Sequence, residues 1–291
     1  MKRVFFPGEE WLYLRLYLGP ETAEYWLANI LPSLLAELEN QGMVKKCFYL
    51  RYLDPAFHLR IRFEIIKPEF FGPVVQMCQE YSKDLYEEKL IWKVEIGSYD
   101  RELERFGNDW IEAAENIFTF DTRFWLSILP ELYDNDEGEN KRWQVALLSA
   151  HGILIDFAFP IESRIELVTK MVDTLSHEIG GGKKLRLQID EKFRKSRSQL
   201  ENILVDSKEL KLPVFINAIN NRSDSIKNIP AFEESVKSWD SKLRETRIAD
   251  LIHLSLNRGL RSRHRMQELV LYSFLKQLYV SARARSVTNQ G

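Results

Sequence analysis

The sequence predicts an α+β protein: a ferredoxin-like βαββαβ unit with an antiparallel sheet over residues 1–100, then a mainly helical half over residues 101–291. Three observations predict this class. The first hundred residues hold four short segments rich in aromatic and β-branched residues. Two longer segments between them have apolar residues at helical spacing. After residue 100 the strand signal fades and amphipathic segments follow one another. We expect the two halves to pack together as one domain.

Alternation and helical spacing assign the elements of the first half. The expected strands are 11–18, 47–52, 58–65 and 92–99, and the expected helices are 20–40 and 68–90. Asp54-Pro55 is a turn signal between the second and third strands. Every second residue of strand 58–65 is apolar and suits a helix-covered face. The intervening His58, Arg60 and Arg62 therefore project on the opposite face, which needs water, a partner or a ligand.

Helical spacing dominates the second half. The expected helices are 110–118, 123–132, 141–158, 161–179, 185–210, 233–253 and 265–282. We expect an acidic loop at 133–140, a turn-rich linker at 221–230 and a frayed tail after Ala284. The acidic loop does not match a calcium-binding loop, because its glycine is in the fifth place from Asp134 and not the sixth.

Composition excludes several classes of protein. The 291 residues carry 41 Lys+Arg against 43 Asp+Glu and are 45% hydrophobic, which is typical of a globular protein and not of one that coats nucleic acid. The sequence has no secretory signal and no membrane span, so we expect the cytoplasm. Cys47 and Cys78 are far apart and predict two reduced thiols. The five histidines are scattered, so we expect no metal site, and common nucleotide-binding and hydrolase motifs are missing.

Three charged segments stand out. In the first, Arg51, His58, Arg60 and Arg62 fall within twelve residues on two adjacent strands. They form either a solvated sheet face or a pocket for a carboxylate or oxyanion, because the planar fork of arginine binds carboxylates in a bidentate manner.

The other two segments lie outside these strands. Glu102 and Arg105 are three residues apart, so in a helical turn they share one face, as a surface ion pair or as part of a site. His253 ends an expected helix and precedes an arginine cluster at 258–265. This histidine is either structural or a proton-transfer group.

Together these segments resemble the glutamate-elimination domain of class I lanthipeptide dehydratases, also described as the thiopeptide-type bacteriocin biosynthesis domain. The family's aromatic first strand is matched by Trp11, Tyr13 and Tyr17. Its arginine motif is matched by Phe48 or Tyr49, Arg51, Tyr52, Asp54, Pro55, His58, Arg60 and Arg62. Its later motifs are matched by Tyr99, Glu102, Arg105, Phe106 and Gly107, by Ala114, Glu115 and Phe118, and by His253, Asn257 and Arg258. The ordered set covers residues 11 to 282. Phe106 stands where the family usually has Tyr, and Asn108 where a second Gly is common.

The resemblance implies a lyase that expels glutamate from glutamylated Ser or Thr of a ribosomally made precursor peptide, leaving dehydroalanine or dehydrobutyrine, as the separate elimination subunit of a split dehydratase. It implies catalytic roles for Arg60, Arg62, Glu102, Arg105 and His253, with either Glu102 or His253 as the base, and substrate contacts for Arg51, His58, Asn257 and Arg258. It implies no cofactor, and as partners the precursor peptide with its leader and a tRNA-dependent glutamylating subunit. No direct contact with nucleic acid is expected, and a homodimer stays open.

Two alternatives remain from the sequence. Thiopeptide pyridine synthases resemble the same domain and join two dehydroalanines in a [4+2] cyclisation with loss of the leader. The other is a non-catalytic subunit that binds a peptide or partner, for which the edge strand of a sheet offers a surface.

Overall fold

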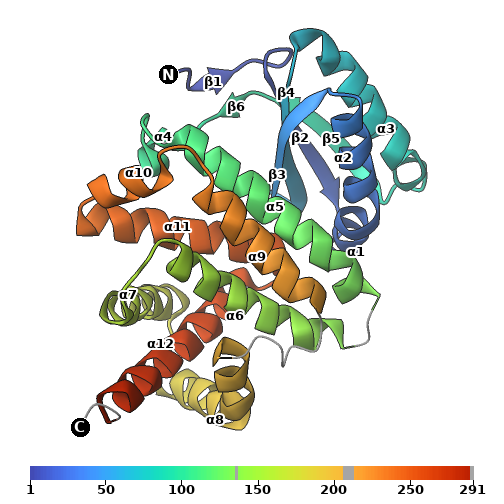
Figure 1. Cartoon of the computed structure of the whole chain (residues 1–291). Helices are drawn as coiled ribbons and strands as arrows, with labels where there is room; N and C mark the ends of the chain where they lie inside the picture. Colours follow the sequence, from blue (N-terminus) through green and yellow to red (C-terminus); the bar gives the residue numbers. More distant parts are fainter. Residues whose placement is uncertain (135–136, 206–212, 289–291) are drawn as a thin grey trace. The chain divides into compact units, whose positions relative to one another are not determined.

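The computed structural model describes residues 1–134, 137–205 and 213–288, and confirms the α+β class (Figure 1). The chain divides into two compact units. Unit 1 comprises Met1–Gly138 with Asn228–Phe232, and unit 2 comprises Glu139–Lys227 with Glu233–Gly291. This division differs from the boundary expected near residue 100.

Unit 1 contains the ferredoxin-like sheet. Its strands β2 (Trp11–Leu18), β3 (Val44–Tyr52), β4 (His58–Ile65) and β5 (Ile91–Gly97) pair antiparallel in the order β3-β4-β2-β5. Helix α1 (Pro20–Tyr25) continues through a π-helical turn (Trp26–Ile30) into α2 (Leu31–Asn40). Helix α3 (Phe71–Glu87) follows the short 3-10 helix Pro68–Phe70. The βαββαβ order predicted from the sequence is therefore confirmed.

These helices lie on one side of the sheet and close a core on it (Figure 1). The apolar alternation of strand 58–65 supplies part of this core, since Leu59, Ile61 and Phe63 are fully buried in it. Burial of aliphatic and aromatic side chains at about 25 cal/mol per Å² is the main stabilising term of such a layer. The helix-covered face is thus the one that the periodicity predicted.

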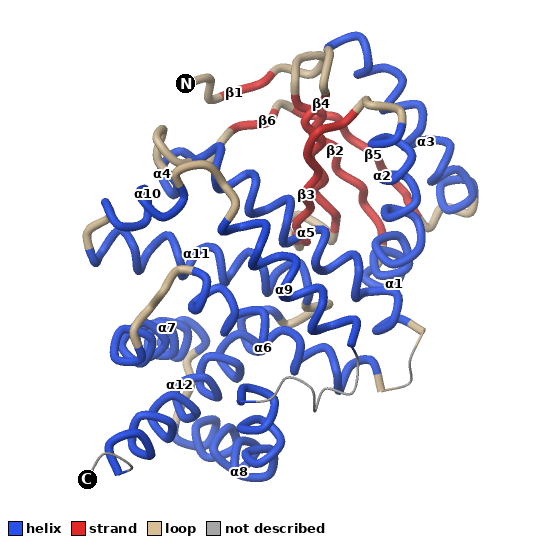
Figure 2. The backbone as a smooth tube through the Cα atoms, in the orientation of Figure 1, coloured by secondary structure: helices blue, strands red, loops and turns tan. Residues whose placement is uncertain are grey.

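The end of the predicted strand 92–99 differs from expectation. Residues Tyr99–Asp100 form a separate short strand, β6, which pairs with β1 (Val4–Phe5) instead of β2 (Figure 2). The turn of helix α4 (Leu103–Phe106) follows, and then the long helix α5 (Ile111–Tyr133).

Helix α5 explains why unit 1 extends past residue 100. Two helices were expected at 110–118 and 123–132, but the intervening polar residues stay helical, and the hydroxyl of buried Thr119 donates to the carbonyl of Glu115 at 2.9 Å. Helix α5 contacts β3, and Leu126 and Leu129 join the core beneath the sheet. It therefore belongs to the α+β unit.

The secondary-structure elements described in unit 2 are all helices. Its helices are α6 (Gly138–Asp156), α7 (Ile161–Ile179), α8 (Lys183–Val205), α9 (Pro213–Lys227), α10 (Phe232–Ser238), α11 (Ser241–Gly259) and α12 (His264–Thr288). The three boundaries between the units fall next to the first residues of α6 and α10 and after the last residue of α9. None of the helices described in the chain is long and apolar enough to cross a membrane.

Three predictions for this unit were wrong in part. The linker expected at 221–230 is helical to Lys227, because Arg222 is buried and donates to the carbonyl oxygen of Ser149 at 3.0 Å. The helix expected at 233–253 is interrupted at Asp240, which caps α11 by accepting from the amide of Leu243 at 2.8 Å. The tail expected to fray after Ala284 is helical to Thr288, and residues 289–291 lie outside the described part.

Two further predictions fall partly on residues that are not described. Of the acidic loop expected at 133–140, residues 135–136 lie outside the described chain, and α6 already begins at Gly138. Of the helix expected at 185–210, the described part is α8, and 206–212 lie outside it.

Candidate functional site: an arginine-bearing sheet face and a histidine–glutamate pair

The face of the unit 1 sheet opposite α1, α2 and α3 carries the predicted arginines. Arg62 lies opposite Tyr13 on β2 and Phe48 on β3, and directly opposed residues of an antiparallel pair share a face. Arg60 lies opposite Arg15 in the same way. The prediction that His58, Arg60 and Arg62 share the face opposite the helices is confirmed.

Arg62 is buried among aromatic rings. Only 6% of the residue is exposed, and its guanidinium carbon lies 4.7 Å from the ring centre of Tyr13, 5.4 Å from Phe48 and 5.3 Å from Tyr99. Within the described chain its buried Nε and Nη1 have no hydrogen-bond partner, and no carboxylate forms an ion pair with it. The ring faces stabilise the cation. They cannot accept its hydrogen bonds as an anion would, so this arginine has the environment of an anion-binding group.

Arg60 is held in place by its neighbours. Its guanidinium carbon stacks 3.4 Å from the ring centre of Tyr52, and its Nε donates to Nε2 of His58 at 3.0 Å. Nδ1 of His58 donates to the carbonyl of Ala56 at 2.8 Å. Burial, with the nearby charges of Arg60 and Arg15, lowers the pKa of His58. A neutral His58 therefore orients Arg60, while the η nitrogens of Arg60 have no carboxylate partner among the described residues.

A second polar cluster on this face was missed by the sequence analysis. Glu95 of β5 accepts from Arg15 at 3.1 Å and from the hydroxyl of Tyr17 at 3.0 Å, and lies 2.6 Å from the ammonium of Lys93. The alternation Tyr13-x-Arg15-x-Tyr17 in strand 11–18 was an available signal, because it places these side chains on the face that bears Arg60.

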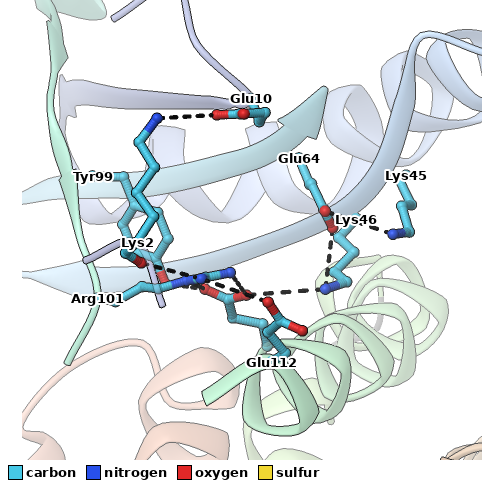
Figure 3. A network of polar contacts seen from close by, with 9 residues as sticks. Lys2, Glu10, Lys45, Lys46, Glu64, Tyr99, Arg101 and Glu112 are labelled. Carbon is cyan, nitrogen blue, oxygen red and sulfur yellow. Dashed lines mark hydrogen bonds and ion pairs between the residues drawn. The ribbon is translucent and has the colours of Figure 1, made fainter. Parts of the chain in front are cut away.

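A buried ion network holds Tyr99, one of the three rings around Arg62, in place (Figure 3). Arg101 contacts both carboxylate oxygens of Glu115 at 2.7 Å, and the hydroxyl of Tyr99 donates to the same carboxylate at 2.9 Å. Burial, then the charge of Glu115, raises the pKa of Tyr99 well above its usual range, so the phenol stays neutral and donates. Lys46 of β3 lies 3.9 Å from Glu115 and 3.1 Å from Glu64. The network ties β6, α5 and the sheet together beside Arg62.

Glu102 and Arg105 form the expected pair. Their side chains meet at 2.7 Å across one turn and are 38% and 32% exposed. Phe106 anchors this turn: it is fully buried, with its ring 5.2 Å from that of Phe118. Gly107 then takes a positive φ of 75°, a conformation that favours glycine. The phenylalanine in place of the family's tyrosine is thus a core residue.

Arg51 is not brought together with Arg60 and Arg62. It lies opposite Leu59 and so projects on the helix-covered face. There it pairs with Glu24 of α1 at 2.9 Å, and both side chains are completely buried. Adjacent residues of a strand project on opposite faces, and Arg51 has the parity of the core residues. The structure gives it a place in the core and not in the arginine face.

In unit 2, His253 is paired with a carboxylate. Its Nδ1 lies 3.0 Å and 3.1 Å from the two oxygens of Glu268 on α12. Glu268 is 1% exposed, whereas the imidazole is 30% exposed. A carboxylate only accepts hydrogen bonds, so Nδ1 carries the proton and Nε2 is left for chemistry. The sequence contained no signal for Glu268, because two helices bring it to His253 from fifteen residues away.

The other two predicted site residues of α11, Asn257 and Arg258, lie in different environments. Asn257 is one turn after His253 and shares its side, whereas Arg258 is 1% exposed. The arginine cluster expected at 258–265 is divided further. Arg261 pairs with Glu139 at 3.2 Å, and Arg265 pairs with Glu178 at 3.1 Å. Among the described residues, no group of three or more His, Cys, Asp or Glu side chains could hold a metal ion.

The family model described as "Lantibiotic biosynthesis dehydratase C-term" matches residues 11–279. The chain belongs to this lantibiotic dehydratase C-terminal family. Similar curated proteins are the nisin biosynthesis protein NisB of Lactococcus lactis subsp. lactis, 27% identical over 96% of this chain, and the subtilin biosynthesis protein SpaB of Bacillus subtilis, 32% identical over 42% of it. The match spans 26% of the length of NisB and 12% of the length of SpaB.

Solved structures share the fold of this family member. The tRNA-dependent lantibiotic dehydratase MibB from Microbispora sp. 107891 superposes with a TM-score of 0.75 at 18% identity, over 96% of this chain and 28% of that one. The pyridine synthase TbtD from thiomuracin biosynthesis superposes with a TM-score of 0.65 at 16% identity, over 94% and 99% of the two chains. At such identities these matches show the fold alone.

Proposed function

We propose that this member of the dehydratase C-terminal family is a lyase that eliminates glutamate from glutamylated Ser or Thr residues of a precursor peptide. One observation carries the proposal: Arg62 is buried within an aromatic enclosure and has no carboxylate partner in the described chain. A glutamyl ester carries a carboxylate, and its elimination passes through an enolate. An arginine prearranged for an anion suits both.

The proposed reaction has a simple balance of atoms. A base removes the α proton of the esterified residue, and the electron pair moves through the enolate to form the Cα–Cβ double bond. The bond from Cβ to the ester oxygen breaks, and glutamate leaves with a new carboxylate. The products are dehydroalanine from Ser and dehydrobutyrine from Thr, and no cofactor takes part.

Three arginines of unit 1, Arg60, Arg62 and Arg105, supply positive charge in this proposal. Arg60 and Arg62 bind the glutamyl carboxylate or stabilise the enolate. Arg105 acts with them, and the carboxylate of Glu102 orients it through the 2.7 Å contact. His58 and Asn257 are proposed to support substrate contacts. The buried pair with Glu24 argues against such a role for Arg51, and the substrate contact of Arg258, which is 1% exposed, stays a prediction.

His253 is the proposed proton-transfer group. Glu268 holds the Nδ1 proton, which leaves Nε2 able to accept the α proton, whereas the carboxylate of Glu102 is engaged with Arg105. Orientation of a catalytic histidine by a carboxylate is a recurrent arrangement in enzymes that transfer protons. The proposal therefore takes His253, and not Glu102, as the base, a choice that the sequence left open.

The proposed partners are a precursor peptide, with its leader, and a tRNA-dependent glutamylating protein. The curated relatives are several times longer than this chain, so the glutamylating step is assigned to polypeptide outside it. We place the reaction in the cytoplasm, where the buried Cys47 and Cys78 remain thiols.

Mass spectrometry of a glutamylated peptide, with its leader attached, tests the proposal. Incubation with the purified chain should release glutamate and leave a dehydroamino acid, and Arg62→Met or His253→Ala should slow this release strongly. Release at the wild-type rate in both variants, or no release by the wild-type chain, would contradict the proposal.

A pyridine synthase is the second candidate, because the fold match to TbtD extends over 94% of this chain and 99% of that one. The same assay distinguishes it when a dehydrated peptide replaces the glutamylated one. Leader release with a new pyridine absorbance would identify a cyclase. No reaction with either substrate, together with peptide binding, would favour a non-catalytic binding subunit.

A further inference from the structure

Three rows of directly opposed residues cross the face of the unit 1 sheet that bears Arg60 and Arg62. From β5 through β2 to β4, they are Gly97–Tyr13–Arg62, Glu95–Arg15–Arg60 and Lys93–Tyr17–His58. Among these nine residues Glu95 is the acidic one, and its side chain is 31% exposed and accessible from solvent. A carboxylate on such a cationic face either neutralises its neighbours or binds a cationic group of the substrate.

The two oxygens of the Glu95 carboxylate have different partners. Oε2 accepts from Nη1 of Arg15 at 3.1 Å and from the hydroxyl of Tyr17 at 3.0 Å, and these two contacts hold the carboxylate in place. Oε1 lies 2.6 Å from the ammonium of Lys93. The hydrogen bonds from Lys93, then Tyr17, lower the pKa of Glu95, so the carboxylate is ionised at neutral pH. One oxygen is thus fixed by the sheet, and the other binds an ammonium group.

The ammonium of Lys93 shows which chemistry this place accepts. It contacts Oε1 of Glu95 and lies 4.8 Å from the ring centre of Tyr17, so a carboxylate and an aromatic face contact the same cation. The side chain of Lys93 is 53% exposed and sits on a flexible four-carbon stem. Exposed ion pairs of this kind contribute little stability, so another ammonium group can displace Lys93.

We propose that Glu95 is a specificity-determining residue that binds the α-ammonium of the glutamyl group, and that Lys93 occupies this place until the substrate binds. The inference rests on the proposed elimination of glutamate. Whichever carboxyl forms the ester, a glutamyl group keeps one free carboxylate and its α-amino group, which is largely protonated at pH 7. Arg60 and Arg62 serve the carboxylate in the proposed function, and Glu95 supplies the opposite charge on the same face.

The geometry of the sheet allows one glutamyl group to reach both kinds of partner. Directly opposed residues have Cβ atoms about 4.5–5.5 Å apart, so the Cβ atoms of Glu95 and Arg60, at the two ends of one row, are separated by about 10 Å. Arg15, between them, leans toward the row of Arg62, since its Nε donates to the hydroxyl of Tyr13 at 3.1 Å. The amine and the free carboxylate of a glutamyl group are a few bonds apart and bridge the gap between the ends of the two side chains.

Elimination from two matched peptides tests the role of Glu95. The same Ser of a leader-bearing peptide is esterified with glutamate or with glutarate, which has the same carbon chain and lacks the amine, and kcat/KM is measured for each by mass spectrometry. Wild type should prefer the glutamyl peptide. Glu95→Gln should reduce this preference about 10- to 100-fold, the range for a hydrogen bond to a charged group. Differences in leaving-group chemistry cancel, because both proteins act on the same two esters.

A second lysine–glutamate pair of unit 1 provides the matched controls. Lys83 and Glu87 of α3 lie 3.8 Å apart, and both side chains are more than half exposed. Glu87→Gln should leave the preference unchanged. Lys93→Met removes the competing ammonium and should raise the preference by up to about fivefold, the range of an exposed ion pair, whereas Lys83→Met should have no effect.

The outcomes separate this inference from the proposed function. Elimination by wild type with the same preference in Glu95→Gln would overturn the role of Glu95 and leave the lyase in place. An equal loss of kcat/KM with both peptides would also overturn it, because Glu95 would then merely position Arg15. No elimination from either peptide by wild type would contradict the lyase, and this inference with it.

Discussion

Two buried arginines on opposite faces of one sheet have different environments. Arg51 projects into the helix-covered core, where the carboxylate of Glu24 lies 2.9 Å away and both side chains are fully buried. Arg62 projects on the other face, where three aromatic rings surround it and no carboxylate of the described chain pairs with it. Burial is similar, but the counter-charge is not. A buried cation matched by the protein indicates structure, and one left for an external anion indicates a site.

Arg51→Met should produce the largest loss of stability. It leaves the carboxylate of Glu24 buried without its guanidinium, which costs about 3–5 kcal/mol of unfolding free energy. Urea denaturation of purified proteins measures this loss. Arg51→Met combined with Glu24→Leu should recover most of it, since an apolar pair of similar volume can replace a buried ion pair. A stable single variant would show that the pair is unimportant and break the comparison.

Arg62→Met is the same chemical change on the other face of the sheet. We expect it to lower the activity and to leave the stability intact. The proposed elimination should slow by about 100- to 1,000-fold, the range for removing one group that stabilises an oxyanion. Its stability should be unchanged or higher, because a buried charge disappears and methionine keeps the apolar contacts. Glutamate release under single-turnover conditions measures the rate. A destabilised Arg62→Met with normal activity would reverse the assignment.

The pair His253–Glu268 extends the comparison to unit 2, because here a buried carboxylate serves a partly exposed imidazole. Glu268→Gln should lower kcat of the proposed reaction by about 10- to 100-fold with little change in KM, since it disturbs the orientation of His253 and not substrate binding. Glu268→Asp should restore part of kcat. An equal loss of stability and activity in both variants would show a merely structural role.

His151 provides a contrast with His253, because its ring nitrogen contacts the hydroxyl of Tyr279 at 2.8 Å and, among the described residues, no carboxylate. Burial lowers the pKa of His151 from 6.5 to about 4. The unfolded chain therefore takes up a proton before the folded chain, so stability present above pH 6.5 is lost as the pH falls toward 4. A shift of this size corresponds to a loss of roughly 3 kcal/mol.

Thermal unfolding of wild type and His151→Gln between pH 7 and 4.5 measures this contribution. The wild-type midpoint should fall more steeply than that of the variant. Parallel curves would show that His151 does not set the acid sensitivity.

The alternation of strand 58–65 was sufficient to predict which face carries Arg60 and Arg62, because side-chain direction in a strand follows from sequence position. The same rule, applied to Arg51, would have placed it on the core face. The sequence analysis instead grouped Arg51 with His58, Arg60 and Arg62, because nothing in the local sequence distinguishes an arginine that becomes buried. The spacing of Glu102 and Arg105 predicted their contact for a similarly local reason. The two helices expected at 110–118 and 123–132 are one, since tertiary packing buries the polar residues between them.

Short-range pattern thus decided the α+β class, the βαββαβ order and the arginine face, since each depends on periodicities of two or 3.6 residues. Packing between distant segments decided the rest. It assigned α5 to the sheet unit and Glu24 to Arg51, and it brought Glu268 to His253 and three rings to Arg62. These contacts join residues from separate elements. The burial and the charge balance of these residues depend on which surfaces pack together, and the local sequence does not determine that packing.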